Sequence, residues 1–306
     1  MRRYLRGFAS ASLGPRSDVG SRKYGPRALV VGASDGIGAS FASALAARGL
    51  DVILVARRRE PLAALAERLR TAHGVETSVV VADVGTPEGV DAVDRAADGV
   101  GLLVCNAAFA PIGPFVALTP SQVDAVLDVN CRAAVRLTHS IGSAMVARGR
   151  GGVILLSSMA GAQGSALVAH YAATKAYLRV LAEGLWTEWR PRGVDVLACC
   201  PGLVRTPTYL ASFPARLGRL VPAPMEPDRV VRAALAALGR RPVVIPGWRN
   251  RLAASAVARL LPRSAALALV SRQTRAMYPS AQRSGAAAEA SPTESHRPAP
   301  ADGSDG

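Results

Sequence analysis

Short apolar runs and longer amphipathic stretches alternate along most of the chain. The short runs are rich in β-branched residues and apolar on both faces, which is typical of strands in a parallel sheet that helices cover on both sides. Seven runs predict strands at residues 28–31, 52–55, 78–81, 102–105, 153–156, 194–198 and 243–245, and the clearest helical stretches are residues 39–48, 62–72 and 171–189. The pattern predicts an α/β fold with a single doubly wound parallel sheet of seven strands and helices on both faces.

The two ends of the chain lack this alternation. Residues 1–26 are rich in Arg, Ser and Gly, and residues 279–306 are rich in Ala, Ser, Pro and Glu. Because both have little to bury, we expect a flexible basic extension at the N-terminus and a disordered tail at the C-terminus. Residues 27–248 then form the sheet domain, followed by an apolar, Arg-bearing helical segment at 249–278. That segment either covers a cleft or a subunit contact, or lies on a membrane surface through residues 249–272.

Composition and charge exclude several classes of protein. Half of the 306 residues are hydrophobic and 19% are charged, so the chain is not disordered throughout. No apolar run approaches the roughly 20 residues that a membrane-spanning helix needs. The net charge of +15 comes largely from Arg near both ends, and aromatic residues are only 5% of the chain, without the interleaving with basic residues that stacks bases. We therefore expect no nucleic-acid partner.

The four cysteines indicate a reducing compartment. They lie in apolar stretches and form no CxxC pair, and no His lies near them at metal-ligand spacing. Buried reduced thiols and no metal site are therefore expected. The N-terminal segment has no continuous apolar stretch of the kind found in cleavable secretory signals. We expect a cytoplasmic protein, peripheral to the membrane if the C-terminal helical segment binds lipid.

A glycine-rich turn directly follows the first predicted strand. It reads Gly32-Ala-Ser-Asp-Gly-Ile-Gly38, and a helix is predicted to begin next. A dinucleotide needs a tight turn, close backbone approach to its pyrophosphate and free N–H groups at a helix N-terminus. The position between strand and helix makes this turn a candidate cofactor site. Its binding residues would be Gly32, Ser34, Gly36, Ile37 and Gly38.

The strongest chemical signal is a tyrosine and a lysine four residues apart in a predicted helix. Tyr171 and Lys175 share one helix face, so the ammonium can act on the phenol. Lys175 is one of only two lysines in the chain. Ser158 follows the fifth predicted strand, thirteen residues before Tyr171. Since ligands bind at the carboxyl ends of strands in open α/β sheets, both side chains are expected at one crevice.

These motifs together resemble the short-chain dehydrogenase/reductase superfamily. Asn130 matches that family's helical Asn and completes an Asn-Ser-Tyr-Lys set. The resemblance covers roughly residues 25–248 and implies a Rossmann-type catalytic domain and an NAD(P)-dependent oxidoreductase that acts on CH–OH or C=O groups. It also implies further cofactor contacts, at Asp83 and Val84 for the adenine, at Asn106 and Ala107 for its ribose, and at Pro201, Gly202, Val204 and Thr206 for the nicotinamide carboxamide.

The end of the second predicted strand bears on the choice of cofactor. An NAD-selective site usually presents a carboxylate here, whereas a cation accepts the 2'-phosphate of NADP. Ala56 holds the position of the family's acid and Arg57 follows it, with Ser34 available to the same phosphate. NADP(H) is therefore the preferred cofactor and NAD(H) the alternative, and Arg57 is the residue expected to bind the 2'-phosphate. Arg59 is interpreted as a solvated residue at a helix start.

The resemblance also implies a role for each catalytic residue. Tyr171 would be the general acid or base, with a phenol pKa lowered by Lys175 and by the nicotinamide's positive charge. Ser158 would hold the substrate oxygen. Asn130 would hold a water that links Lys175 to solvent.

The residues around the predicted crevice also bear on the substrate, and the resemblance bears on the oligomeric state. Residues 207–225, where the family carries a mobile substrate lid, are mainly apolar, and Leu167, Val168 and His170 would line the opposite wall. An apolar carbonyl or alcohol that is lipid-, steroid- or polyketide-like is expected, in a homodimer or homotetramer. The alternative is a catalytically silent, NADP-binding regulator or scaffold of the same fold.

Overall fold

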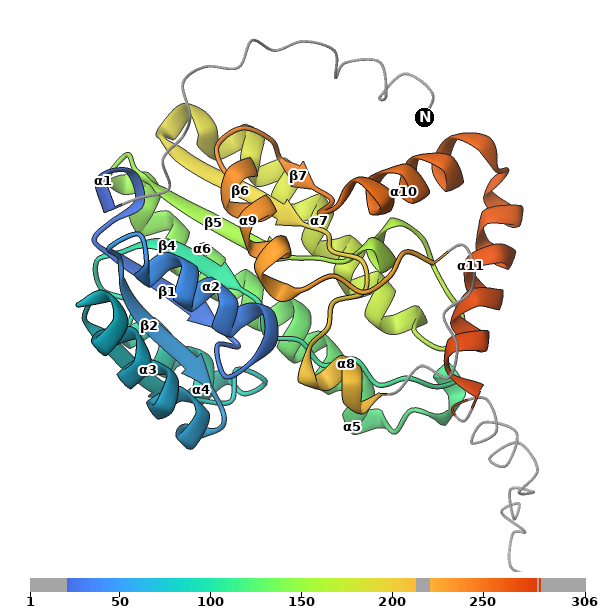
Figure 1. The fold of residues 1–306 in the computed structure, drawn as a ribbon, viewed down its shortest axis with the longest axis horizontal. Coiled ribbons are helices and arrows are strands. Elements are labelled where there is room, and N and C mark those ends of the chain that lie inside the picture. Colours follow the sequence, from blue (N-terminus) through green and yellow to red (C-terminus); the bar gives the residue numbers. More distant parts are fainter. Residues whose placement is uncertain (1–20, 213–220, 280, 282–306) are drawn as a thin grey trace, which may run out of the picture.

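A seven-stranded parallel sheet forms the centre of the molecule (Figure 1). The structure is a computed structural model that describes residues 21–212, 221–279 and 281. The sheet order is β3-β2-β1-β4-β5-β6-β7. The strands are β1 (Arg27–Val31), β2 (Asp51–Ala56), β3 (Thr77–Val81), β4 (Val100–Cys105), β5 (Gly151–Leu156), β6 (Val194–Cys199) and β7 (Val243–Val244). The predicted doubly wound parallel sheet is confirmed, with a last strand of two residues.

Helices cover both faces of the sheet, and each face has its own hydrophobic core. In β1 the side chains alternate between the two cores, with Val30 in one and Leu29 in the other. This two-sided burial explains why the strands read as continuous apolar runs. Helices α2 (Gly36–Ala46), α3 (Arg59–His73) and α9 (Pro227–Ala237) cover one face, and α4 (Pro87–Arg95), α6 (Ala133–Ala147) and α7 (Ala169–Trp189) cover the other.

The strand order reverses between β1 and β4, which are neighbours in the sheet but not in the chain. Helices that leave two such strands depart to opposite faces, so a crevice opens at their carboxyl ends. The remaining helical segments include α5 (Pro120–Leu127), the π-helical turn η2 (Asp128–Arg132) and α8 (Pro207–Ala211), with 3-10 turns η1 (Phe115–Ala117), η3 (Met159–Ala162) and η4 (Arg190–Arg192).

An N-terminal turn, α1 (Ser21–Tyr24), packs against the sheet just before β1. Tyr24 is buried and donates a 2.5 Å hydrogen bond to Asp195 in β6, and Lys23 forms a 2.7 Å ion pair with the same carboxylate. Folded structure therefore begins before Arg27. Residues 1–20 of the expected basic extension lie outside the described residues, as do residues 280 and 282–306 of the expected tail.

Two helices follow β7 and lie together beside the sheet domain (Figure 1). They are α10 (Trp248–Leu260) and α11 (Arg263–Met277), separated at Pro262. Within the ranges that the structure describes, no helix is both long and apolar enough to cross a bilayer.

Candidate active site

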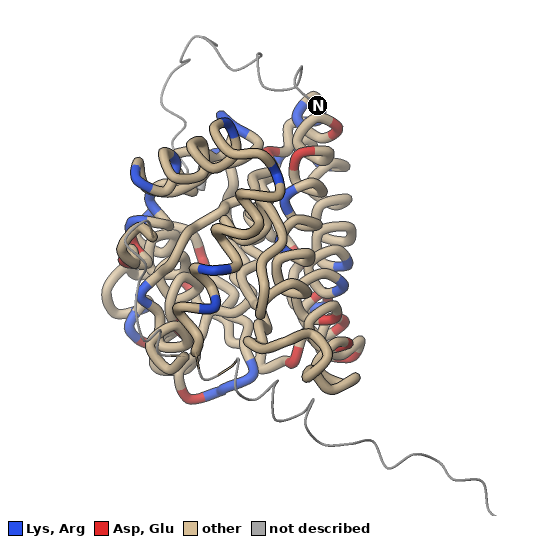
Figure 2. The backbone as a smooth tube through the Cα atoms, turned by 90° about the vertical axis from the view of Figure 1, so that its right-hand side faces the viewer, with Lys and Arg blue, Asp and Glu red and all other residues tan. Residues whose placement is uncertain are grey.

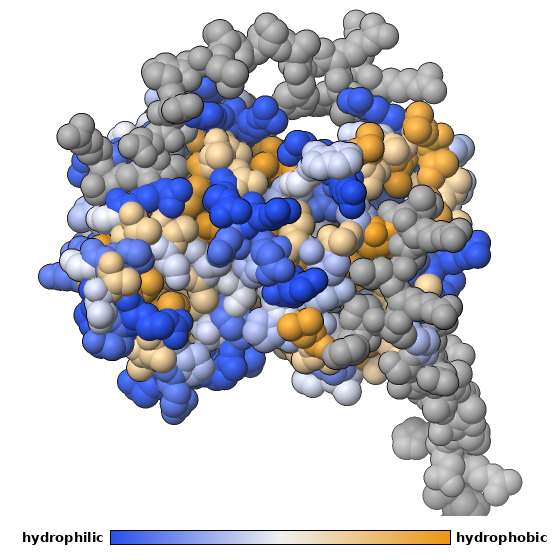
Figure 3. Space-filling model, in the orientation of Figure 1, coloured by the Kyte–Doolittle hydropathy of each residue, from blue (hydrophilic) through white to orange (hydrophobic). Residues whose placement is uncertain are grey.

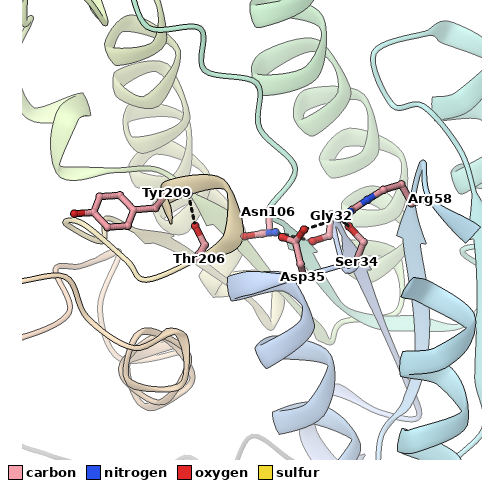
Figure 4. Close-up of polar contacts among 7 residues, drawn as sticks. All are labelled: Gly32, Ser34, Asp35, Arg58, Asn106, Thr206 and Tyr209. Carbon is pink, nitrogen blue, oxygen red and sulfur yellow. Dashed lines mark hydrogen bonds and ion pairs between the residues drawn. The ribbon is translucent and has the colours of Figure 1, made fainter. Parts of the chain in front are cut away.

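The glycine turn brings three backbone segments into close contact. Gly32 has φ +82°, and a Cβ there would lie 2.7 Å from the Ala107 nitrogen. At Gly38 a Cβ would lie 1.9 Å from the Gly32 carbonyl oxygen. Asn106 donates from Nδ2 to that same oxygen at 2.9 Å (Figure 4). Side chains larger than Gly are therefore sterically excluded at both positions, and the turn is held against the carboxyl end of β4.

The start of α2 fits a pyrophosphate. The N-cap residue Asp35 makes no side-chain capping hydrogen bond, so no side chain of the cap satisfies the first N–H groups of the helix. Gly36 has φ +54°, and Thr206 lies against it, close enough that a Cβ at Gly36 would be 2.8 Å from the Thr206 methyl carbon. Ile37 instead packs partly buried against the first core. The glycine turn therefore faces the segment that follows β6.

Two arginines at the end of β2 point to different partners. Arg58 donates to Ser34 Oγ at 3.1 Å and to Asp35 Oδ2 at 2.5 Å (Figure 4). Arg57 lies 3.9 Å from Asp83 Oδ2. The residue that the structure places at Ser34 is thus Arg58, which the sequence analysis did not single out. Arg57, which it did, lies on the Asp83 side.

The predicted adenine and ribose contacts occupy the turns after β3 and β4. Asp83 accepts a 2.9 Å hydrogen bond from the Gly85 nitrogen, which fixes the turn after β3. Val84 is buried in the second core, and Ala107 packs partly buried against the same core. The backbone nitrogen of Ala107 bonds the Val31 oxygen at 2.9 Å. All four predicted residues thus lie at the carboxyl edge of the sheet, but the Val84 side chain points into the core.

Ser158, Tyr171 and Lys175 meet at the end of β5. The Ser158 hydroxyl forms a hydrogen bond with the Tyr171 phenol and also accepts one from the Ala160 nitrogen at 3.1 Å. Lys175 is 2% exposed and donates to the Leu156 oxygen at 2.8 Å, with Nζ 5.5 Å from the centroid of the Tyr171 ring. The two oxygens that the sequence predicts to converge therefore do so.

A neighbouring serine fixes this geometry. Ser157 is buried, and its hydroxyl donates to the Lys175 carbonyl oxygen at 2.6 Å. Behind it, a Cβ at Gly161 would lie 2.6 Å from the carbonyl carbon of Lys175, so η3 packs directly on the α7 backbone. Helix α7 is therefore held against the end of β5 on both sides of Ser158, by the Ser157 hydroxyl and by the backbone at Gly161.

Asn130 lies in the π-helical turn η2, the kind of helix irregularity that is frequent at functional sites. Its side chain is 1% exposed and fully engaged. Oδ1 accepts from the Phe109 nitrogen at 2.7 Å, and Nδ2 donates to the Phe109 oxygen at 2.9 Å and to Thr174 Oγ1 at 3.0 Å. The side chain thus joins the segment after β4 to α7, one residue before Lys175.

Burial moves the pKa values of the two central groups in opposite directions. It lowers the pKa of the Lys175 ammonium to about 8. It raises the pKa of the Tyr171 phenol, the Ser158 hydrogen bond opposes that rise, and the nearby Tyr278 phenol adds to it. The family resemblance implies a phenol pKa that Lys175 and the charge of a bound nicotinamide lower, whereas the pKa of Tyr171 without that bound charge is raised. The net direction is upward because loss of water around the phenol outweighs the hydrogen bond.

The segment after β6 reaches the same crevice. The Pro201 oxygen accepts from the Met159 nitrogen at 2.9 Å, which ties this segment to the residue after Ser158. Val204 is buried and pairs with Met225 in an isolated bridge. Thr206 caps α8 by accepting from the Tyr209 nitrogen at 3.2 Å (Figure 4). Residues 213–220 of the predicted lid lie outside the described residues.

The C-terminal helices contribute contacts that sequence reasoning missed. Asn250 of α10 is buried against Gly202, and its Nδ2 donates to the Pro246 oxygen at 2.9 Å. Ser165 and Thr274 of α11 share a buried 2.7 Å hydroxyl hydrogen bond. Two further bonds join the Ala166 nitrogen to Ser271 Oγ at 3.1 Å and Gln163 Nε2 to the Ala266 oxygen at 3.3 Å. Helix α11 is thus fastened to the loop between Ser158 and Tyr171.

A small, mainly apolar hollow of about 10 Å³ adjoins Tyr171. Leu167, with φ +66°, holds an unusual backbone conformation, and its oxygen accepts from the Gly113 nitrogen at 2.9 Å. His170 Nε2 bonds the Val123 oxygen at 2.9 Å and meets Phe115 edge to face. The lining residues are Pro111, Gly113, Phe115, Leu118, Leu167, Val168, Ala169, His170 and Tyr171. The predicted wall residues therefore do border the phenol.

Comparisons with known proteins place this site in a family. Over 233 residues the chain is 32% identical to a 7beta-hydroxysteroid dehydrogenase of Collinsella aerofaciens, covering 75% of this chain and 89% of that protein. It is 34% identical over 218 residues to the inactive hydroxysteroid dehydrogenase-like protein 1 of Homo sapiens, covering 69% and 66%. The short-chain dehydrogenase of Sphingobium yanoikuyae in complex with NADPH matches with a TM-score of 0.67 at 34% identity, covering 77% and 94%.

Residues 26–215 match the family model described as short chain dehydrogenase. That range contains the glycine turn, Ser158 and the Tyr171/Lys175 pair. Since it also spans more than half of the chain, the protein belongs to the short-chain dehydrogenase family of oxidoreductases.

Proposed function

We propose that the protein is an NADP(H)-dependent oxidoreductase that interconverts a secondary alcohol and a ketone on an apolar, steroid-like substrate. The observation that carries the proposal is the meeting of Ser158, Tyr171 and Lys175 at the carboxyl end of β5. The neighbouring glycine turn, β4 end and post-β6 segment offer a continuous set of backbone groups that fits a dinucleotide. Apolar residues that border Tyr171, among them Phe115, Leu118 and Leu167, suit an apolar substrate.

In this proposal each side chain has a separate task. Tyr171 exchanges a proton with the substrate oxygen, and Ser158 holds that oxygen by a hydrogen bond. The raised phenol pKa keeps Tyr171 protonated at neutral pH, which suits donation to a carbonyl. Lys175 favours the phenolate that donation leaves, and Asn130 positions α7. When bound, the nicotinamide supplies or accepts the hydride.

The residues that would hold the cofactor follow from the same geometry. Gly32, Gly36 and Gly38 would admit the pyrophosphate at the start of α2. Ser34, Arg57 and Arg58 would contact the 2'-phosphate, while Asp83, Val84, Asn106 and Ala107 would border the adenosine. Pro201, Gly202, Val204 and Thr206 would border the nicotinamide. A relative's NADPH complex supports this choice of cofactor.

The proposed substrate class rests on the relatives as well as on the apolar residues beside Tyr171. One relative is named a 7beta-hydroxysteroid dehydrogenase. Another is named inactive, which keeps a catalytically silent, NADP-binding regulator as the second candidate. The intact Ser158, Tyr171 and Lys175 geometry favours the enzyme.

The two candidates separate in one assay. The full-length protein is mixed with NADPH and a panel of keto-steroids, polyketide-like ketones and sugars, and NADPH absorbance at 340 nm is followed. If the protein is an enzyme, we expect its turnover of keto-steroids to be well above its turnover of sugars. The protein would instead be a catalytically silent regulator if it binds NADPH but turns over no carbonyl with NADPH and no alcohol with NADP.

Cofactor choice is tested at the end of β2. We expect Arg57→Asp and Arg58→Asp each to lower the NADPH to NADH ratio of kcat/KM by roughly 10- to 100-fold, the value of a lost charge-assisted hydrogen bond plus repulsion. Arg59→Asp is the matched control, because Arg59 is exposed at the start of α3 and should leave the ratio unchanged. A normal ratio in both variants would place the phosphate contact elsewhere.

The outer faces of α5 and α7 support a homo-oligomer. Leu127, Tyr177 and Val180 are exposed apolar residues there, with Val180 at 66%. We expect a mass of two or four chains in solution by light scattering, reduced toward one chain by Val180→Asp. A monomeric wild-type protein at micromolar concentration would contradict this assembly.

A further inference from the structure

Helix α10 leaves most of its surface in solvent. Of its 13 residues only Asn250 is buried. Trp248 and Leu252, four residues apart on one helix face, are each 63% exposed, and Leu260 is 76% exposed. Leu261, at 36%, follows directly. Figure 3 shows hydrophobic surface gathered at the upper right, where α10 meets α11. Clustered apolar residues of this size indicate a binding surface.

The charge around this apolar group has one sign. From Arg229 to Ala288 the sequence contains no Asp or Glu. Four exposed arginines flank the apolar residues, and none forms an ion pair with a residue that the structure describes; they are Arg249, Arg251, Arg259 and Arg263. Arg249 lies over the Trp248 ring, 5.3 Å from its centroid. Figure 2, which views this side of the molecule, shows basic positions along the helices.

These features favour one occupant. Guanidinium groups bind the phosphates of anionic headgroups, while Trp and Leu enter the interface between headgroups and acyl chains. A second copy of the same surface would bring Arg against Arg without a compensating acid. Nucleic acid would satisfy the charge but leave Leu252 and Leu260 in water. We infer that α10 and Leu261 form a surface that docks on an anionic lipid bilayer.

Helix α10 is joined to the segment after β6, and its neighbour α11 is joined to the loop before Tyr171. Asn250 anchors the start of α10 on Gly202, and α11 is bonded to the loop between Ser158 and Tyr171. A bilayer held at α10 would therefore lie beside the segment after β6, which Asn250 contacts at Gly202. Membrane binding itself does not depend on the oxidoreductase activity. Only the further idea that an apolar substrate is taken up from the bilayer rests on the proposed function.

The test is vesicle sedimentation of the full-length protein. Vesicles of pure phosphatidylcholine are compared with vesicles in which three lipids in ten are phosphatidylserine. We expect binding to the anionic vesicles only, weakened by salt. Arg249→Gln/Arg251→Gln/Arg259→Gln and Trp248→Ser/Leu252→Ser/Leu260→Ser should each lower the partition coefficient at least tenfold, because the first removes headgroup contacts and the second removes insertion.

A matched variant separates the surface from overall charge. Arg68→Gln/Arg95→Gln/Arg192→Gln removes the same charge from exposed positions elsewhere and should change partitioning less than threefold. Brominated lipids should quench Trp248 fluorescence, and Trp248→Phe should abolish that quenching. Equal losses in both arginine variants, binding to DNA but not to vesicles, or self-association in place of vesicle binding would each overturn the inference. NADPH turnover of a water-soluble ketone, expected to be unchanged in the α10 variants, reports separately on the proposed function.

Discussion

Tyr171→Phe is expected to lower kcat by a factor of about 10³ or more while NADPH affinity stays unchanged. The substitution removes one oxygen, the one that hydrogen-bonds Ser158, and leaves the ring that lies beside Lys175. Proton transfer is therefore lost without disturbing the packing of α7. The measurement is steady-state NADPH oxidation with the best ketone of the panel, together with a fluorescence titration of NADPH binding.

Tyr177→Phe is the matched control for that variant. Tyr177 lies on the same helix, but it is 48% exposed and faces away from the crevice. It should retain full kcat. A Tyr171→Phe protein with wild-type turnover would remove Tyr171 from the mechanism. A loss of NADPH affinity equal to the loss of kcat would mean that the phenol serves binding rather than proton transfer.

The second large effect is expected from Lys175→Met, which should lower kcat/KM about a hundredfold and yet stabilise the fold at neutral pH. Burial depresses the pKa of Lys175 to about 8, so at pH 7 the folded state holds a costly buried ammonium. Removing it should raise the free energy of unfolding by about 1 to 2 kcal/mol, after allowing for the Leu156 oxygen that loses its donor.

The pH dependence of this gain has a defined sign. Below pH 8 the Lys175 ammonium is charged in both the folded and the unfolded state, so the increase in unfolding free energy caused by Lys175→Met has its full value. Between the folded pKa of about 8 and the ordinary value of 10.5 the unfolded chain binds more protons, so the wild-type protein gains stability and the difference closes. Urea unfolding at pH 7 and pH 10 measures both values. A variant that is less stable at pH 7 would contradict the buried-charge account.

Lys23→Met is the control, since it removes the chain's other lysine. The Lys23 ammonium pairs with Asp195, which Tyr24 also contacts. Its loss leaves a buried carboxylate with one partner fewer, so stability should fall instead of rising. Turnover should be unaffected.

The parallel sheet and the Tyr171/Lys175 pair can be predicted from the sequence because local residue patterns determine them. Runs such as residues 28–31 are apolar on both faces, and only a sheet covered twice buries them. Tyr171 and Lys175 share a helix face by their spacing alone. Positions 32 and 38 must be Gly because other backbone atoms lie too close to admit a Cβ in this turn between strand and helix.

Contacts between segments that lie far apart in the chain cannot be predicted from such local patterns. The choice of Arg58 over Arg57 as the partner of Ser34 depends on where two adjacent guanidinium groups point and on Asp35, 23 residues earlier. The Ser165 and Thr274 hydroxyls meet across 109 residues, and neither lies in a motif. The upward pKa of Tyr171 likewise depends on burial and on Tyr278, which only tertiary packing supplies.

The hydrogen bonds between α11 and the loop before Tyr171 have a consequence for synthesis on the ribosome. Every strand that the structure describes and the hydroxyl groups of Ser158 and Tyr171 lie before residue 245, so they are synthesised before α11. The Ser165 hydroxyl and the Ala166 nitrogen therefore gain their partners only once α11 has been synthesised. We therefore expect the loop before Tyr171 to gain these hydrogen bonds only after the sheet has been synthesised.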